Sequence, residues 1–254
     1  MAQYRNSKDI GVTFNNRRVA IPIERQRELL LNARSHGEAS WHVQKITAEF
    51  VKGYDFLQKF DKSVTFFGSA RNGFDDAVYR EAEQLAGFLA KMGFTVFTGG
   101  GPGIMEAANK GAQEAGGTSV GININLPEQK GHMTERRNPY IDEAESFDFF
   151  FSRKVILSFA SQFYIFFPGG FGTMDELFEM LTLVQTGKIS PVPIILVGKD
   201  FWTPLTEFIR YTMYEKGRAI SEEDLDLFHV VADAEEAMAF ITTCLAQDNR
   251  YKRS

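Results

Sequence analysis

A chain of 254 residues with 44% hydrophobic content can bury the core of one large α/β domain or two small ones, and one domain with an N-terminal extension fits better. Its formal net charge of −5 gives no global field favouring nucleic acid or an anionic membrane surface, so any anionic ligand must be held locally. A single cysteine, a polar N-terminus and the lack of any apolar run near the roughly 18 residues that span a bilayer predict a soluble, cytoplasmic protein without membrane partners.

Residues 1–60 differ from the rest of the chain. A polar segment comes first, and a helical stretch follows from Ala39 to Phe60. Its apolar side chains recur mostly at intervals of three and four residues: Trp41, Val43, Ile46, Phe50, Tyr54 and Leu57. This amphipathic stripe predicts packing on the domain or on a second subunit, so we interpret 1–60 as an N-terminal extension.

From Ser63 onward, apolar β-rich runs alternate with helical patterns. The predicted strands are Ser63–Gly68, Phe94–Thr98, Thr118–Ile124, Gln162–Phe167, Pro193–Val197 and Phe228–Val231. The predicted helices are Asp75–Met92, Gly103–Ala115, Arg153–Ser161, Thr173–Gln185, Phe201–Lys216 and Ala234–Ala246. This alternation predicts a Rossmann-like, doubly wound parallel sheet with helices on both faces, in one domain spanning 61–254.

The loops after the first two strands contain small and flexible residues. The first strand ends in Phe67-Gly68-Ser69-Ala70-Arg71, where Ser69 is either a turn residue or a ligand hydroxyl. Thr98-Gly99-Gly100-Gly101-Pro102-Gly103-Ile104-Met105-Glu106 follows the second strand, and its backbone amides can approach an anion at a helix N-terminus. It lacks both the nucleoside-triphosphatase P-loop and the dinucleotide fingerprint. The alternative is a tight turn that binds no ligand.

The long loop Leu126–Glu145 is expected to act as a lid or binding loop. His132 within it and the three other histidines lack metal-ligand spacing, so no metal site is predicted. Arg153-Lys154 then places two cations at the start of a helix, where positive charge opposes the helix dipole. Either an anion compensates these charges, or the two residues are an ordinary surface pair.

The stretch Pro168-Gly169-Gly170-Phe171-Gly172-Thr173-Met174-Asp175-Glu176 repeats the glycine arrangement after another strand. Gly170 and Gly172 permit close approach of a phosphate, and Thr173 is predicted to be the N-cap with its hydroxyl turned to a phosphate oxygen. Two carboxylates at a helix start usually complement the helix dipole. With Glu179 one turn later, they would instead form an acidic cluster beside the anion site.

These motifs together resemble the LOG (LONELY GUY) family, whose most specific pattern is Pro-Gly-Gly-x-Gly-Thr-x-x-Glu. The resemblance covers about Ser63 to Ala246. It implies a phosphoribohydrolase that cleaves the N-glycosidic bond of purine nucleoside 5′-monophosphates, either AMP or cytokinin-type, without a cofactor. It also implies a homo-oligomer, because family members associate through helices beside the site.

By the same resemblance, Arg153 and Glu176 take the positions of the family's catalytic arginine and glutamate. The substrate and its phosphate would be bound by Ser69, Gly99, Gly100, Gly101, Gly103, Met105, Lys154, Gly169, Gly170, Gly172, Thr173 and Glu179. Asp175 replaces a glutamate common in plant members, which leaves the base preference open, and Asn138-Pro139-Tyr140 and Met105 are candidate pocket walls. The label of lysine decarboxylase lacks support, because no pyridoxal-phosphate lysine site is recognisable.

Two other functions compete with the enzyme. The scaffold also resembles molybdenum-cofactor carrier proteins, which bind a phosphate and cleave no bond. A weaker alternative is a regulatory subunit that assembles through its N-terminal helix. The presence of both Arg153 and Glu176 favours the enzyme.

Overall fold

The computed structural model describes residues 11–14, 17–20, 36–73, 76–125 and 137–247. The chain divides into two compact units, 1–48 and 49–254. In the smaller unit, β1 (Gly11–Phe14) pairs antiparallel with β2 (Arg17–Ala20) where only a polar segment was predicted. Helix α2 (His36–Leu57) begins in the smaller unit and ends in the larger one.

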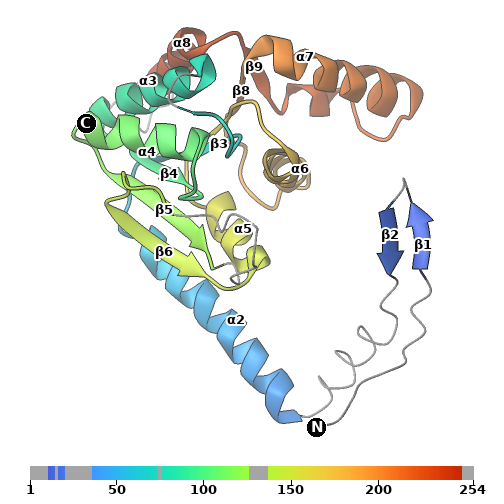
Figure 1. The fold of residues 1–254 in the computed structure, drawn as a ribbon. Helices are drawn as coiled ribbons and strands as arrows, with labels where there is room; N and C mark the ends of the chain where they lie inside the picture. The colour runs from blue at the N-terminus through green and yellow to red at the C-terminus, as the bar shows by residue number, and fades with distance from the viewer. Residues whose placement is uncertain (1–10, 15–16, 21–35, 74–75, 126–136, 248–254) are drawn as a thin grey trace. The chain divides into compact units, whose positions relative to one another are not determined.

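The described part of the larger unit is built on a seven-stranded parallel sheet (Figure 1). In chain order its strands are β3 (Ser63–Phe67), β4 (Thr95–Thr98), β5 (Ser119–Ile124), β6 (Glu143–Phe147), β7 (Phe163–Phe166), β8 (Ile194–Val197) and β9 (His229–Val231). Their order across the sheet is β6-β5-β4-β3-β7-β8-β9. The predicted doubly wound fold is therefore confirmed, and the strand order reverses between β3 and β7.

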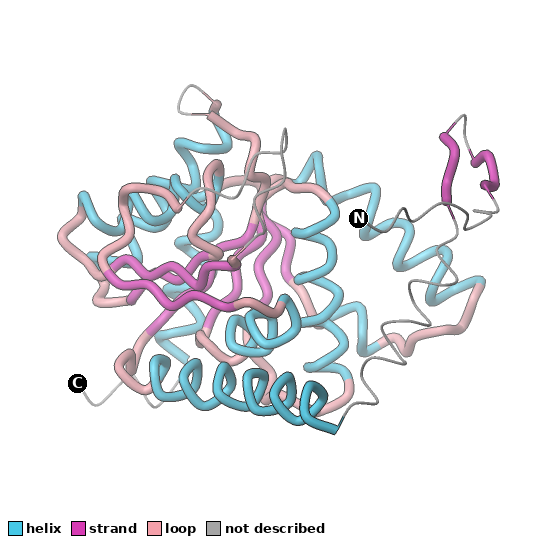
Figure 2. The backbone as a smooth tube through the Cα atoms, turned by 60° about the horizontal axis from the view of Figure 1, so that its bottom comes forward, coloured by secondary structure: helices cyan, strands magenta, loops and turns pink. Residues whose placement is uncertain are grey.

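Helices lie on both sides of the strands (Figure 2). The core on one face includes side chains of α3 (Ala77–Lys91), α4 (Ile104–Glu114) and α8 (Ala234–Gln247). The core on the other face includes side chains of the end of α2, α5 (Phe150–Ser158), α6 (Phe171–Gln185) and α7 (Lys199–Glu207). A strand covered on both faces is mostly apolar. In β3, Phe66 therefore joins the first core while its neighbour Phe67 joins the second.

The strand β6 was missed because its sequence, Glu143-Ala144-Glu145-Ser146-Phe147, shows no apolar run. It lies at the edge of the sheet and pairs only with β5 among the described strands. Edge strands commonly have charged residues that discourage pairing with other chains. The predicted long loop is accordingly shorter, and its residues 126–136, which include His132, lie outside the described part of the chain.

The prediction that Thr173 is the N-cap of α6 was wrong. Gly170 is the N-cap, with an extended backbone (φ −94°, ψ −155°), and its carbonyl accepts the first intrahelical bond, from Met174 N (3.1 Å). Thr173 thus lies in the first turn and is buried. Glycine tolerates the N-cap position without a side chain to bond there, so the helix starts two residues earlier than predicted.

The predicted helix Phe201–Lys216 is two segments. Its first part belongs to α7, and the chain continues as a π-helical segment, η1 (Phe208–Lys216). At the end of η1, Gly217 N donates to Thr212 O (2.9 Å), five residues back. The apolar pattern alone does not separate these two helix types, because both place apolar residues on one face at similar intervals.

The C-terminal half of α2 contacts α5 through a buried carboxylate. Glu49 Oε1 accepts from Asp148 N (2.6 Å), just before α5, and Glu49 Oε2 accepts from Ser152 Oγ. Phe56 of α2 is buried, whereas Trp41 and Val43 are exposed. Among the described residues, the apolar stripe of α2 is thus buried at its C-terminal end only in part. Of the described helices, none combines the length and apolarity needed to cross a bilayer.

Gly103 lies so close to the backbone of the loop after β3 that only glycine fits at position 103. It has φ +74° and ψ −131°, and a Cβ there would collide with the carbonyl oxygen of Ser69. We expect Gly103→Ala to lower the free energy of unfolding by about 3 kcal/mol or more, since strain and a backbone clash add together. Chemical denaturation measures the change.

Gly93→Ala is the matched control. Gly93 also has a positive φ (+82°), but a Cβ there meets nothing within 4 Å. Its cost should be limited to backbone strain of about 1 kcal/mol. Equal losses for the two variants would contradict the close packing of Gly103 against Ser69.

Candidate active site

Three loops meet at the carboxyl edge of the sheet, where the strand order reverses. Ser69, after β3, donates from its backbone N to Pro168 O (3.0 Å), in the loop after β7. The carbonyl of Ser69 accepts from Ile104 N (2.9 Å), at the start of α4 after β4. The main chain of Ser69 therefore connects both glycine loops. Its side-chain oxygen accepts from Arg71 N (3.1 Å), as in a turn residue.

The first glycine loop is shaped by what lies against it. Gly103 is the N-cap of α4, and no side chain caps this helix. Gly100 has φ +77°, and a Cβ on it would collide with Asn123. A Cβ on Gly99 would collide with the guanidinium of Arg153 and approach Met105 Sδ at 2.9 Å. The glycines thus allow an arginine to lie directly on the loop backbone.

A network of buried polar groups forms hydrogen bonds with the backbone of this loop. Asn138 N donates to Gly100 O (3.0 Å), and Asn138 Nδ2 donates to Gly101 O (3.0 Å) and to Asn109 Oδ1 (3.0 Å). Thr98 Oγ1 also donates to Asn109 Oδ1 (2.6 Å) and accepts from Gly100 N (2.9 Å). Buried polar groups that are fully bonded fix one conformation.

Sequence reasoning placed Asn138 only as a candidate pocket wall and missed the structural part of Asn109. A signal for Asn109 was present. It is an amide in an alanine-rich helix, and Ala108, Gly111 and Ala112 around it are buried. A buried amide without partners is costly, so its position alone predicts a hydrogen-bonding network.

Arg153 lies buried in the first turns of α5 and points at the carboxyl ends of two strands. Its Nε donates to Ile122 O in β5 (2.8 Å), and its Nη2 donates to Gly99 O (3.1 Å). These bonds fix the plane of the guanidinium beside the first glycine loop. A buried cation in this position provides a fixed positive charge at the site.

The second glycine loop is more open than the first. Cβ atoms on Gly170 and Gly172 would meet nothing within 4 Å, and Phe171 between them is 98% exposed. Gly169 differs, because a Cβ there would collide with Thr173 Oγ1. The hydroxyl of Thr173 therefore lies against the backbone of this loop. The open glycines at the start of α6 leave room for a ligand near a helix N-terminus.

Glu176 follows this loop on α6 and has an unusual carboxyl. Burial raises its pKa, the charges of Lys154 and Arg153 lower it, those of Glu179 and Asp175 raise it, and the resulting pKa is about 7. Its protonated and ionised forms are thus both populated near neutral pH. Shifted carboxyl groups of this kind occur at catalytic sites.

The structure brings most predicted site residues to one edge of the sheet. Ser69, the two glycine loops, Met105, Arg153 and Thr173 lie there as described. Lys154 instead bonds to Asp175 (Nζ to Oδ2, 2.8 Å) and forms an ion pair with Glu179 (Nζ to Oε2, 3.3 Å). No group of three or more potential metal ligands occurs among the residues that the structure describes.

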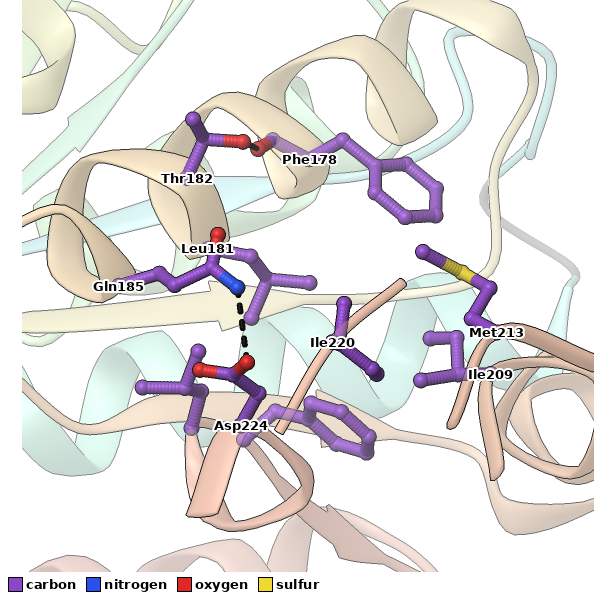
Figure 3. A pocket seen from close by; sticks show the side chains of 10 residues that line it. Phe178, Leu181, Thr182, Gln185, Ile209, Met213, Ile220 and Asp224 are labelled. Atoms are coloured by element: carbon purple, nitrogen blue, oxygen red, sulfur yellow. Dashed lines mark hydrogen bonds between the residues drawn. The ribbon is translucent and has the colours of Figure 1, made fainter. Parts of the chain in front are cut away.

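A separate small cavity of about 80 Å³ lies between α6 and η1 (Figure 3). Its walls are mostly apolar and include Phe178, Leu181, Ile209, Met213, Ile220 and Phe228. At its polar end, Gln185 Nε2 donates to Asp224 Oδ2 (2.8 Å). Neither glycine loop lines it, and neither Arg153 nor Glu176 does. The cavity is therefore distinct from the candidate site.

The sheet, its reversal point and the two glycine loops define a Rossmann-like α/β protein. A family model described as possible lysine decarboxylase matches residues 105–241. The chain belongs to this family, which is the LOG family that its motifs resemble.

Two curated relatives and one solved structure show what the chain is similar to. A cytokinin riboside 5′-monophosphate phosphoribohydrolase of Rhodococcoides fascians is 28% identical over 155 residues, which are 61% of this chain and 77% of the relative. A pyrimidine/purine nucleotide 5′-monophosphate nucleosidase of Escherichia coli strain K12 is 29% identical over 149 residues, 55% of this chain and 33% of the relative. The molybdenum cofactor carrier protein of Chlamydomonas reinhardtii matches with a TM-score of 0.52 over 74% of this chain and 100% of that protein, at 23% identity, and shares the fold.

The raised pKa of Glu176 predicts that the folded state becomes less stable as the pH rises from acid to neutral. A carboxyl with a folded pKa of about 7 and an ordinary value of 4.5 loses stability as pH rises from 4.5 to 7, because the folded state then holds a proton that the unfolded state has released. Glu176→Gln removes this cost. We expect it to raise the free energy of unfolding by about 2 kcal/mol at pH 8, with the gain falling toward zero at pH 4.5.

Urea denaturation at the two pH values, for wild type and Glu176→Gln, measures the difference. The control is Glu143→Gln, which removes an exposed carboxylate of a surface ion pair with Lys59. A stability gain of Glu176→Gln that is the same at both pH values would show that the carboxyl ionises normally.

Proposed function

We propose that this chain is a phosphoribohydrolase that cleaves the N-glycosidic bond of purine nucleoside 5′-monophosphates. The products are the free base and ribose 5-phosphate. The observation that supports it best is a buried arginine on the first glycine loop, together with a carboxyl after the second loop whose pKa burial raises to about 7. The names of the Rhodococcoides fascians and Escherichia coli relatives agree with this reaction. In this proposal, residues 61–254 form the catalytic domain.

The phosphate would be bound by backbone amides of the two glycine loops. Gly170 and Gly172 have open space over their Cα atoms, and the loop leads directly into α6. Ser69 and the hydroxyl of Thr173 lie at the same edge and complete the proposed cradle. Binding energy from the phosphate, which does not react, would orient the ribose for attack. A monophosphate should therefore be preferred over a nucleoside.

The chemistry would use Glu176 and Arg153. Cleavage of the bond between the ribose C1′ and the base nitrogen develops positive charge on the ribose and negative charge on the base. Ionised Glu176 takes a proton from a water molecule whose oxygen bonds to C1′, and the base leaves with the electron pair of the broken bond and then takes up a proton. Arg153 offsets the developing negative charge.

Decarboxylation of lysine is a poorer fit to the site. A lysine that forms a Schiff base must be readily deprotonated. Burial lowers the pKa of Lys154, but its bond to Asp175 and the charges of Glu179 and Glu176 outweigh this effect and raise it overall. The lysine beside the glycine loops is thus held in its charged form.

Purified protein should release adenine and ribose 5-phosphate from AMP, with adenosine a much poorer substrate. Glu176→Gln should lower kcat about 10²- to 10⁴-fold, because it removes the group that transfers the proton. Chromatography of the free base measures both, with AMP and an N6-isopentenyl analogue as substrates. Glu143→Gln serves as the control for loss of a carboxylate far from the glycine loops.

Each alternative has its own result. AMP that binds without release of base would support the carrier function, which the likeness in fold to the molybdenum cofactor carrier keeps in consideration. Release of base by Glu176→Gln at the wild-type rate would remove Glu176 from its proposed role. Sedimentation of the protein at several concentrations would test the proposed homo-oligomer.

A further inference from the structure

Lys154 of α5 bridges two carboxylates of α6. Its Nζ lies 2.8 Å from Asp175 Oδ2 and 3.3 Å from Glu179 Oε2. Asp175 and Glu179 are four residues apart, so they lie on the same face of the helix, and Glu176 follows Asp175 directly. The Lys154 side chain is only 20% exposed, which makes this bridge less screened by water than an ordinary surface pair.

The bridge connects the two helices that hold the proposed catalytic pair. Arg153 precedes Lys154 on α5, and Glu176 follows Asp175 on α6. Lys154 and Asp175 are therefore each the chain neighbour of one member of the proposed catalytic pair. Any change in the spacing of α5 and α6 would move Arg153 relative to Glu176.

Among the residues that the structure describes, four charged groups act on the Glu176 carboxyl. Arg153 and Lys154 belong to α5, and Asp175 and Glu179 belong to α6 itself. After burial, which raises the pKa of Glu176, the largest effect is that of Lys154, which lowers it. The charges of Glu179 and Asp175 raise the pKa of Glu176, opposite to the effect of Lys154.

We infer that Lys154 is a positioning residue, which ties α5 to the first turns of α6 and sets the charge around the Glu176 carboxyl. The inference rests on the proposed role of Glu176 in the reaction. It gives Lys154 and Glu179 a task other than direct contact with phosphate. Asp175 already accepts a hydrogen bond from the ammonium, and Glu179 forms an ion pair with it, so both carboxylates would compete with a phosphate for this cation.

The test is a titration of Glu176 in the free protein. Proteins with ¹³C-labelled glutamate carboxyls are titrated by NMR, and Glu176→Gln identifies the signal. Lys154→Gln should move the Glu176 midpoint to higher pH, by about one unit, because it removes the positive charge that lowers the pKa of Glu176 most. Asp175→Asn and Glu179→Gln should move it to lower pH.

The pH dependence of AMP cleavage provides the second measurement. If ionised Glu176 is the active form, the rate rises with pH through its pKa, and the midpoint should shift in the same opposite directions in the variants. A lysine that only stabilised the helices would lower the rate and leave the midpoint unchanged. Lys154→Arg, which retains the charge, should restore the wild-type midpoint.

Lys59→Gln is the matched control, since Lys59 forms an exposed pair with Glu143 (3.3 Å). It should leave the Glu176 titration unchanged. If Lys154→Gln does not fold, Asp175→Asn still tests the inference, because Asp175 is 61% exposed and its loss should be tolerated.

The two proposals fail in different ways. An unshifted Glu176 signal in folded Lys154→Gln and Asp175→Asn proteins would overturn the inference about Lys154, whether or not AMP is cleaved. Shifted titrations without release of base from AMP would support the inference about the carboxyl and remove the hydrolase function.

Discussion

The candidate site depends on the close contact between the guanidinium of Arg153 and the backbone of Gly99. This contact is possible only because residue 99 has no Cβ, and it is fixed by bonds from the arginine to Gly99 O and Ile122 O. A charged group buried among carbonyl oxygens is stable when its donors are bonded. The contact therefore couples the position of α5 to the ends of β4 and β5, and α5 in turn is held by Glu49 of α2.

The reversal of strand order explains why the two glycine loops lie together. Strands β3 and β7 are neighbours in the sheet, but their following helices lie on opposite faces. A crevice forms at such a point in doubly wound sheets. Ser69 lies at its edge, and its backbone N and O bond to one loop each. The backbone of Ser69 therefore links the two loops.

The fold was predictable because most strands are buried on both faces and their apolar runs are plain in the sequence. The edge strand β6 was not, since its polar residues Glu143, Glu145 and Ser146 leave no apolar run. The π-helical η1 was not, since its apolar spacing resembles that of an α-helix. For the site, motif order indicated which residues share one edge of the sheet. The bridge from Lys154 to Asp175 and Glu179 depends on which face of α5 meets α6, and a residue pattern within either helix does not determine that. The catalytic and binding roles of the site residues stay predictions.

The balance of charge at the site explains why two cations precede the acidic start of α6. A bound phosphate would add negative charge near Glu176, which burial already makes hard to ionise. Without compensation, the carboxyl would stay protonated and could not take a proton from water. Arg153 and Lys154 both lower the pKa of Glu176, one from a buried position on the first glycine loop and the other from its bridge to Asp175 and Glu179. In the proposed reaction, Arg153 and Lys154 of α5 allow the Glu176 carboxyl of α6 to ionise near neutral pH while the phosphate is bound.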